Sequence, residues 1–313
     1  MKKALFAMLV TCLCLFAVAG WAEGEQAEIV FQKGFSVPAD ATTIDFGSVR
    51  IQQWDKLIPF LKQFPNLERV DMYETPLSAK RIRELAETFP EVTFGWTMAL
   101  GSSSCRHWVR TDATAFSTKH GSASETHGSE AFEPLKYCTQ LLALDIGHNK
   151  VEDLSFLYDL PELRVLIIGR NNVKDLTPVG SLKHLEYLEM FSNRVADLTP
   201  LANCTELLDL NICYNRISDV SALTGLKKLG RLWMRRADYY TDYLNPELSE
   251  EQVESLRAAL PDTKIDTVSE PTHGQWRTDN DKDDGVKSPH YAVIHQMFKE
   301  GRYIPFEESM PTD

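Results

Sequence analysis

The sequence predicts a right-handed α/β repeat solenoid with a parallel sheet on its concave side and helical units at its ends. The first observation is a series of asparagines at intervals of 22 residues: Asn149, Asn171, Asn193 and Asn215. Each ends the phrase L-x-x-L-x-[LIM]-x-x-N, which [VI]-x-D-[LV]-x-x-[LV] follows. The second is a longer unit with a helical pattern that flanks this series on both sides. Apolar and polar positions that recur together at a fixed period indicate stacked, similar units.

Each 22-residue unit is expected to form one short strand that turns at the asparagine. In the first unit the strand covers residues 143–147, and Leu144 and Ile146 point into the core because side chains alternate along a strand. The turn leaves backbone groups facing a dry interior. A buried Asn149 side chain can both donate to and accept from these groups, which a leucine cannot do.

The outer side of each unit has room for only a short turn. Pro178 and Pro200 lie in the phrases DLTPVGSL and DLTPLANC, and proline suits a tight convex segment better than a long helix. Over residues 132–236 the phrase N-x-[IV]-x-D-[LIV]-x-P-L resembles the internalin-like class of bacterial leucine-rich repeats. The resemblance implies a solenoid that binds proteins.

The flanking units are longer and helical. Residues 77–94 align without gaps to residues 248–265, and both segments show apolar residues at helical spacing followed by a proline. Ser78 and Ser249 are the expected N-caps. Such units are expected to cover the exposed ends of the repeat core.

These patterns divide the chain into six segments. They are a signal peptide (1–22), N-terminal strand–helix repeats of about 25 residues (23–100), a Ser/Thr/His-rich insertion (101–131), the 22-residue array (132–236), a C-terminal helical end unit (237–265) and a docking tail (266–313).

The N-terminus predicts export. Lys2 and Lys3 precede an apolar run, and small residues before Glu23 suit a cleavage site. A single membrane anchor is the alternative; a lipoprotein is a weaker one, because Thr11 precedes Cys12. We expect a secreted or cell-envelope protein with no membrane span after cleavage.

The charge excludes some partners. The net charge is −12, and removal of the two N-terminal lysines makes it −14. An acidic surface argues against nucleic acid and against anionic membranes as partners. A protein or peptide partner of unknown identity is therefore expected.

The concave strand positions are the candidate binding site. Aromatic and apolar side chains there lie among acidic residues with arginines at the edge, a combination typical of protein interfaces. The alternative is that the insertion or the tail folds over this face. The candidate residues are Val165, Ile167, Tyr187, Glu189, Phe191, Asp209, Asn211, Arg231, Trp233 and Arg235.

The insertion is rich in residues that could carry chemistry. His107, His120 and His127 with Cys105 match no zinc-ligand spacing, so no metal or other cofactor is expected. No carboxylate pair, phosphate loop or catalytic triad phrase indicates an enzyme. The alternating stretch HWVRTDATAF is a candidate strand that extends the sheet.

The tail has two features. DNDKDDG at 279–285 resembles a calcium loop, but His290 stands where the bidentate glutamate should be, so a solvated acidic turn is preferred. A short helix follows, with Tyr291, Ile294 and Phe298 as its apolar stripe. We expect it to pack on the C-terminal end unit; a peptide offered to another protein is the alternative.

The cysteines are expected to remain reduced. Cys138 and Cys204 occupy a repeat position that is leucine elsewhere, three units apart and beyond disulfide reach. A Cys105–Cys138 bond is the best alternative.

The sequence therefore predicts an exported, non-enzymatic protein that binds a protein or peptide through its concave face. The alternative function is a self-associating envelope protein, and a less favoured one is an enzyme that uses the insertion.

Overall fold

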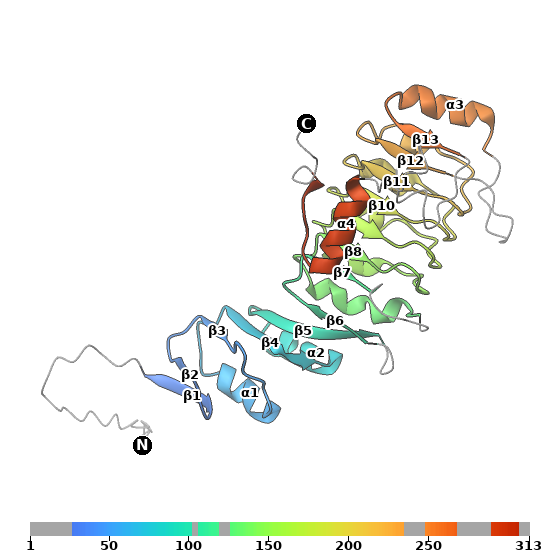
Figure 1. Ribbon diagram of the computed structural model, residues 1–313. Helices are drawn as coiled ribbons and strands as arrows, with labels where there is room; N and C mark the ends of the chain where they lie inside the picture. Colours follow the sequence, from blue (N-terminus) through green and yellow to red (C-terminus); the bar gives the residue numbers. More distant parts are fainter. Residues whose placement is uncertain (1–26, 102–105, 119–125, 235–247, 268–288, 307–313) are drawn as a thin grey trace, which may run out of the picture.

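The computed structural model describes residues 27–101, 106–118, 126–234, 248–267 and 289–306. The strands stack along an elongated molecule, with a small N-terminal sheet at one end and a helix closing the array at the other (Figure 1). The described strands form three sheets, of two, four and seven strands.

The N-terminal part consists of the longer units. The first two strands form an antiparallel hairpin, and the next four form a sheet in chain order whose last strand is antiparallel. Its elements are β1 (Glu28–Gln32), β2 (Phe35–Pro38), β3 (Thr43–Asp45), α1 (Trp54–Leu61), β4 (Arg69–Leu77), α2 (Ala79–Thr88), β5 (Thr93–Gly101) and β6 (Arg106–Arg110).

The array is the seven-stranded sheet, parallel throughout and ordered β13-β12-β11-β10-β9-β8-β7. Its strands are β7 (Ala115–Ser117), β8 (Ala143–Asp145), β9 (Val165–Ile167), β10 (Tyr187–Glu189), β11 (Asp209–Asn211), β12 (Arg231–Trp233) and β13 (Lys264–Asp266). Short 3₁₀ helices form the convex side: η1 (Ser129–Ala131), η2 (Glu133–Tyr137), η3 (Ser155–Asp159), η4 (Val179–Ser181), η5 (Thr199–Asn203) and η6 (Ser221–Leu223).

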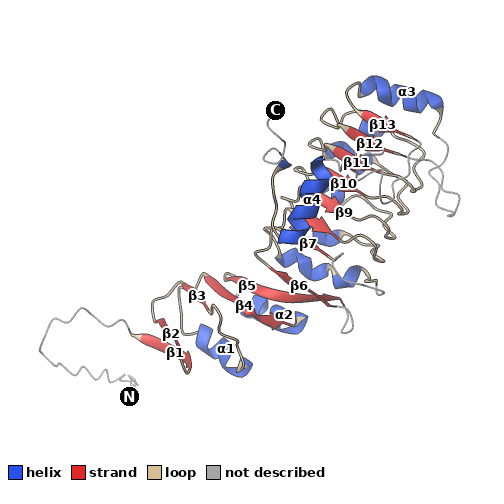
Figure 2. Cartoon of the chain, viewed as in Figure 1, coloured by secondary structure: helices blue, strands red, loops and turns tan. Residues whose placement is uncertain are grey.

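Figure 2 shows this alternation of strand and short helical turn. The parallel solenoid expected from the 22-residue period is confirmed. The stretch HWVRTDATAF also extends the sheets as expected: β6 pairs with β5, and β7 pairs with β8.

The asparagines link successive repeats through their side chains. Asn193 Nδ2 donates to the Ile168 and Met190 carbonyls at 2.9 and 3.0 Å, and its Oδ1 accepts the Val173 N–H at 3.0 Å. Asn171 and Asn215 make the equivalent bonds one repeat away on either side. Asn149, at the first repeat, accepts instead from the His127 N–H at 2.9 Å.

The residue before each asparagine has a left-handed backbone. The φ angles are 61° at His148, 55° at Arg170, 56° at Ser192 and 54° at Tyr214. A side chain disfavours this region, so its recurrence shows that the turn geometry, fixed by the asparagine bonds, overrides local preference.

Helix α3 (Glu250–Ala259) covers the last rung. Ser249 caps it through a reciprocal pair of bonds with Gln252, and Val253 and Leu256 are buried against the core. At the other end Ser78 caps α2 through the Arg81 N–H. Both expected N-caps are therefore confirmed, and α3 closes the core by presenting a polar outer face.

Candidate functional site

The candidate concave residues lie in register on neighbouring strands. Val165, Tyr187, Asp209 and Arg231 pair in one column across β9 to β12, and Ile167, Glu189, Asn211 and Trp233 pair in the next. Parallel pairing without a shift brings these side chains onto one surface. Arg235 lies outside the described residues.

This surface is covered by helix α4 (Pro289–Glu300). Val293, Ile294 and Met297 of α4 form one buried apolar cluster with the concave residues, and Tyr187 is only 1% exposed beneath it. Figure 1 shows α4 lying across the strands of the array. We call residues 289–306 the C-terminal arm.

The expected position of the tail helix was wrong. The arm lies on the concave face, against β7 and β8 and with its first turn at β11, and not on the end unit. The physical reason is that α3 already covers the end of the core, whereas the apolar side chains of the concave column would be exposed to water without the arm. The buried stripe is Val293, Ile294 and Met297; Tyr291 and Phe298 are only partly buried.

Polar contacts hold the first turn of α4. His290 Nδ1 lies 2.8 Å from Asp209 Oδ2, and Arg231 Nε lies 3.2 Å from Asp209 Oδ1. Asp209 is 1% exposed, so this carboxylate is desolvated and its contact with His290 stabilises it more than a surface contact would; among the described residues its Oδ1 has the ion pair but no hydrogen bond. Nearby, the Tyr187 hydroxyl donates to fully buried Glu189 at 3.0 Å.

Further contacts hold the segment that follows α4. Tyr303 donates its backbone N–H to Thr114 Oγ1 at 2.9 Å and its hydroxyl to Glu186 Oε2 at 3.2 Å. Arg164 pairs with the same glutamate at 2.5 Å. Burial, followed by the charge of Glu186, raises the pKa of Tyr303, so its hydroxyl remains a donor at neutral pH.

The arm doubles back after its helix. Gly301 has a φ of +67°, and the Arg302 N–H donates to the Met297 carbonyl at 3.1 Å, a C-terminal turn for which glycine is suited. The returning chain places the Phe306 ring 4.7 Å from the His290 ring. Helix and return segment together cover the face.

One buried donor on this face is not satisfied. Asn211 is fully buried and its Oδ1 accepts the Cys213 N–H at 3.1 Å, yet its Nδ2 has no hydrogen-bond partner in the described part of the chain. An unsatisfied buried donor is unfavourable. Asn211 lies two residues from Asp209 along β11, on the same side of the sheet.

The cysteines of the array are buried thiols. Cys138, Cys204 and Cys213 are free, so the expectation that Cys138 and Cys204 are unbonded is confirmed and the alternative Cys105–Cys138 bond is absent. Burial raises the pKa of Cys138 to about 12 and that of Cys204 to about 11. Such thiols are poor nucleophiles at neutral pH.

The insertion brings two histidines together. The rings of His107 and His127 lie 5.5 Å apart at right angles, and desolvation lowers the pKa of His107. His120 and Cys105, and the acidic turn at 279–285, lie outside the described residues. Within the residues the structure describes, no three His, Cys, Asp or Glu side chains come together as a metal site.

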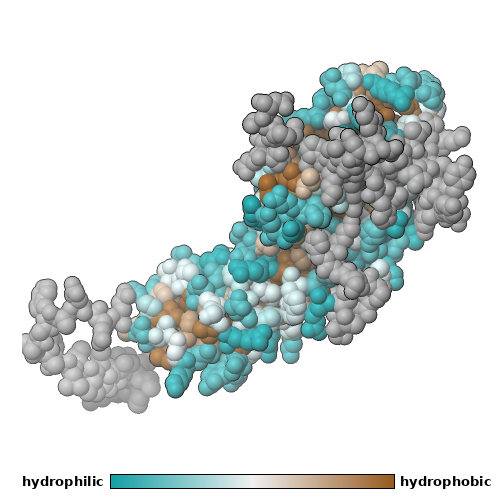
Figure 3. Space-filling model, in the orientation of Figure 1, coloured by the Kyte–Doolittle hydropathy of each residue, from teal (hydrophilic) through white to brown (hydrophobic). Residues whose placement is uncertain are grey.

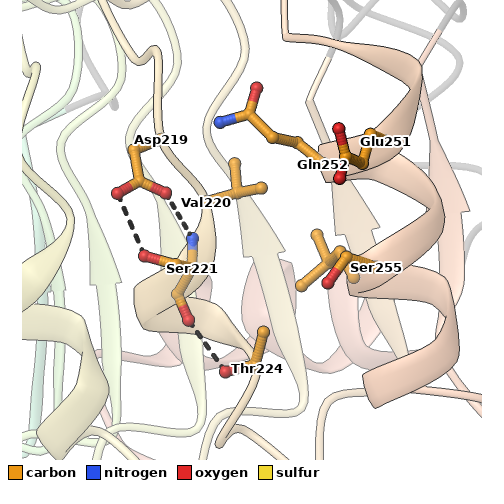
Figure 4. A pocket seen from close by; sticks show the side chains of 8 residues that line it. Asp219, Val220, Ser221, Thr224, Glu251, Gln252 and Ser255 are labelled. Carbon is orange, nitrogen blue, oxygen red and sulfur yellow. Dashed lines mark hydrogen bonds between the residues drawn. The ribbon is translucent and has the colours of Figure 1, made fainter.

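A pocket of about 210 Å³ lies between η6 and α3 (Figure 4). Asp219 and Ser221 line one side and Glu251, Gln252 and Ser255 the other. Asp219 accepts from the Ser221 N–H at 2.8 Å, which serves the turn itself. The pocket marks the change from the short repeat to the helical end unit, and its groups form no catalytic arrangement.

On the face drawn in Figure 3, hydrophilic residues predominate where the chain is described, with smaller apolar patches among them. Among the described residues, the large hydrophobic side chains that are exposed are Val30, Trp108 and Tyr158, and they are far apart in the sequence. No described helix is long and apolar enough to cross a membrane.

The family model for leucine-rich repeats, in two copies, matches residues 161–203. The matched residues include β9, β10 and the turn after each of these strands. The chain has the leucine-rich repeat fold. A comparison with curated proteins found no match.

Solved structures of two internalins and of a leucine-rich repeat protein are similar to this chain. An internalin (inlF) of Listeria monocytogenes has 19% identity and a TM-score of 0.37 over 67% of this chain and 65% of its own. Internalin C2 of the same species has 23% identity and a TM-score of 0.32, over 65% and 77% respectively. A leucine-rich repeat protein of Leptospira interrogans has 18% identity and a TM-score of 0.43, over 66% and 50%.

Proposed function

We propose that this leucine-rich repeat protein is an exported, non-enzymatic protein that binds a protein or peptide through its concave face. The observation that carries the proposal is the arm itself. A peptide segment fills the face through apolar contacts with Ile294 and Met297 and through the His290–Asp209 contact. A surface that holds one peptide segment in this way has the chemistry to hold another.

The test begins with a full-length variant whose arm is released. Ile294→Asp combined with Met297→Asp places two charges against the apolar face, so the arm should leave it. Used against envelope and host-surface extracts, this variant should capture a protein that the native chain captures weakly.

The site is tested by adding Tyr187→Ser, Phe191→Ser and Trp233→Ser to the released variant. Loss of capture, with circular dichroism unchanged, would locate binding on the concave face. Equal capture by both variants would contradict the proposed site.

Export is tested on protein collected from the medium of the cells that naturally produce it. N-terminal sequencing of extracellular material should begin at Glu23. A full-length protein recovered only from membranes would instead support the anchor.

A further inference from the structure

We infer that the external ligand of the concave face is an amphipathic α-helix with a hydrogen-bond donor in its first turn, and that it binds by replacing the C-terminal arm. The inference rests on the proposed function and adds the class of partner. It follows from the shape of the covered surface, from its buried carboxylate and from the fit of the arm.

The shape of the surface favours a helix. At the β7 and β8 end the buried residues are small, Ala115 and Ala143, whereas Tyr187 and Trp233 stand farther along the array. Small residues let a helix approach a sheet closely, and larger ones limit how it can lie. The seated segment uses a helical repeat: His290, Val293, Ile294 and Met297 share one face, as positions three and four apart do on a helix.

The negative charge of the surface determines which residue types the first turn of the ligand can carry. Asp209 is buried; its Oδ2 lies 2.8 Å from His290 Nδ1, and its Oδ1 forms an ion pair, without a hydrogen bond, with Arg231 Nε at 3.2 Å. A ligand without a donor there would leave part of a buried carboxylate unpaired, and a ligand with an acid there would be repelled. Histidine, lysine, arginine or asparagine at that position would suit the site.

The arm does not satisfy this site completely. Among the described residues, Asn211 Nδ2 has no hydrogen-bond partner beneath the arm, and Asp209 Oδ1, two residues away, has an ion-pair contact with Arg231 but no hydrogen bond. A foreign helix that also presents an acceptor to Asn211 would bind more tightly than the arm, by roughly tenfold or more for one satisfied buried donor. The arm is therefore a ligand that a better one can displace.

Because the arm is part of the same chain as the face, a foreign helix must bind more tightly than the arm in order to displace it. The arm and the face that it covers belong to one chain, so the arm binds intramolecularly. An intramolecular ligand has a high effective concentration, which a free helix at micromolar concentration must overcome through affinity. The identical arm of a second copy has no such advantage, and arm exchange between copies should be rare at micromolar concentration.

The experiment uses two fluorescent probes with the full-length chain. One is a peptide with the sequence of residues 289–306. The other is an alanine- and glutamine-based helix that carries only a donor followed by Val, Ile and Met at the spacing of His290, Val293, Ile294 and Met297.

Both probes should bind the released variant, Ile294→Asp with Met297→Asp, at least tenfold more tightly than the native chain. The matched control is Ala292→Asp with Gln296→Asp, which puts two acids on the exposed side of the same helix and should behave as the native chain does. In the probes, exchange of the donor for glutamate, or of the central Ile for proline, should weaken binding at least tenfold. On the protein, Asp209→Asn should weaken it without altering the fold measured by circular dichroism.

The outcomes separate the two proposals. If the released variant captures a protein from extracts but binds neither helical probe, the binding function stands and the helical partner is wrong. Binding that survives proline in the probe would also overturn the helix, in favour of an extended peptide. If neither capture nor probe binding occurs, both proposals fail. A native dimer that dissociates on Ile294→Asp with Met297→Asp would show arm exchange between copies and would also overturn displacement by a foreign helix.

Discussion

At the scale of single residues, the repeat depends on two positions whose chemistry is unusual for their environment. Asn193 is polar in an apolar interior, and four hydrogen bonds, three donated and one accepted, join its own turn to its neighbours. Arg170, one place before an asparagine, has a left-handed backbone that arginine does not favour. In both cases the stacking of repeats stabilises a residue type or a backbone conformation that is unfavourable locally.

Replacement of the buried asparagine tests the first position. Asn193→Leu should lower the free energy of unfolding by roughly 1–3 kcal/mol, because the buried Val173 N–H loses its acceptor and the Ile168 and Met190 carbonyls each lose one of two amide donors. Urea unfolding measures the loss. An equally large effect of exposed Lys174→Ala would contradict this explanation.

Relief of the left-handed strain tests the second position. Arg170→Gly should raise the unfolding free energy by up to about 1 kcal/mol, because glycine adopts a φ of 55° without steric cost. Thermal melting measures the shift. Lys174→Gly at an exposed position is the control, and an equal gain there would show that backbone strain is not the cause.

At the scale of elements, the arm and the solenoid are separate in chain order but share an apolar cluster. The solenoid core under the strands is continuous from the N-terminal sheet to α3, whereas the concave cluster contains side chains of the strands, of the turns after them and of the arm. The arm can therefore leave without opening the main core.

Hydrogen exchange tests that separation. Ile294→Asp with Met297→Asp should remove protection from residues 289–306 and leave β8 to β11 protected, because these strands pair with one another. An apolar dye should bind the newly exposed face, since burial of each apolar side chain of this size contributes roughly 1.5–3 kcal/mol. Loss of protection across the array would mean that the arm is part of the core.

At the scale of the whole molecule, acid should weaken the fold. Hydrogen bonds from the Ser or Thr two residues later lower the pKa of Asp175, Asp197 and Asp219, one in each repeat. A carboxyl group with a folded pKa below its unfolded value stabilises the fold above the unfolded value, near 3.9, and this contribution is lost as pH falls through the folded pKa.

Urea unfolding between pH 5 and pH 3 tests this column of acids. Stability should fall in that interval, and the triple change Asp175→Asn, Asp197→Asn and Asp219→Asn should reduce the fall. The effect will be modest because these carboxyls are exposed. An unchanged pH dependence in the triple variant would assign the acid sensitivity to other groups.

The sequence by itself determined the repeat. Its 22-residue period, its asparagines and the Ser249 N-cap predict the parallel strands, the buried turns and the closing helix, because each depends on side chains near in sequence or repeated at a fixed interval. Only the tertiary structure decided where the arm lies. His290 and Asp209 are 81 residues apart, and no period relates them. The sequence identified an apolar stripe on the tail and an apolar column on the sheet, but two apolar surfaces without a shared register do not reveal that they bind each other.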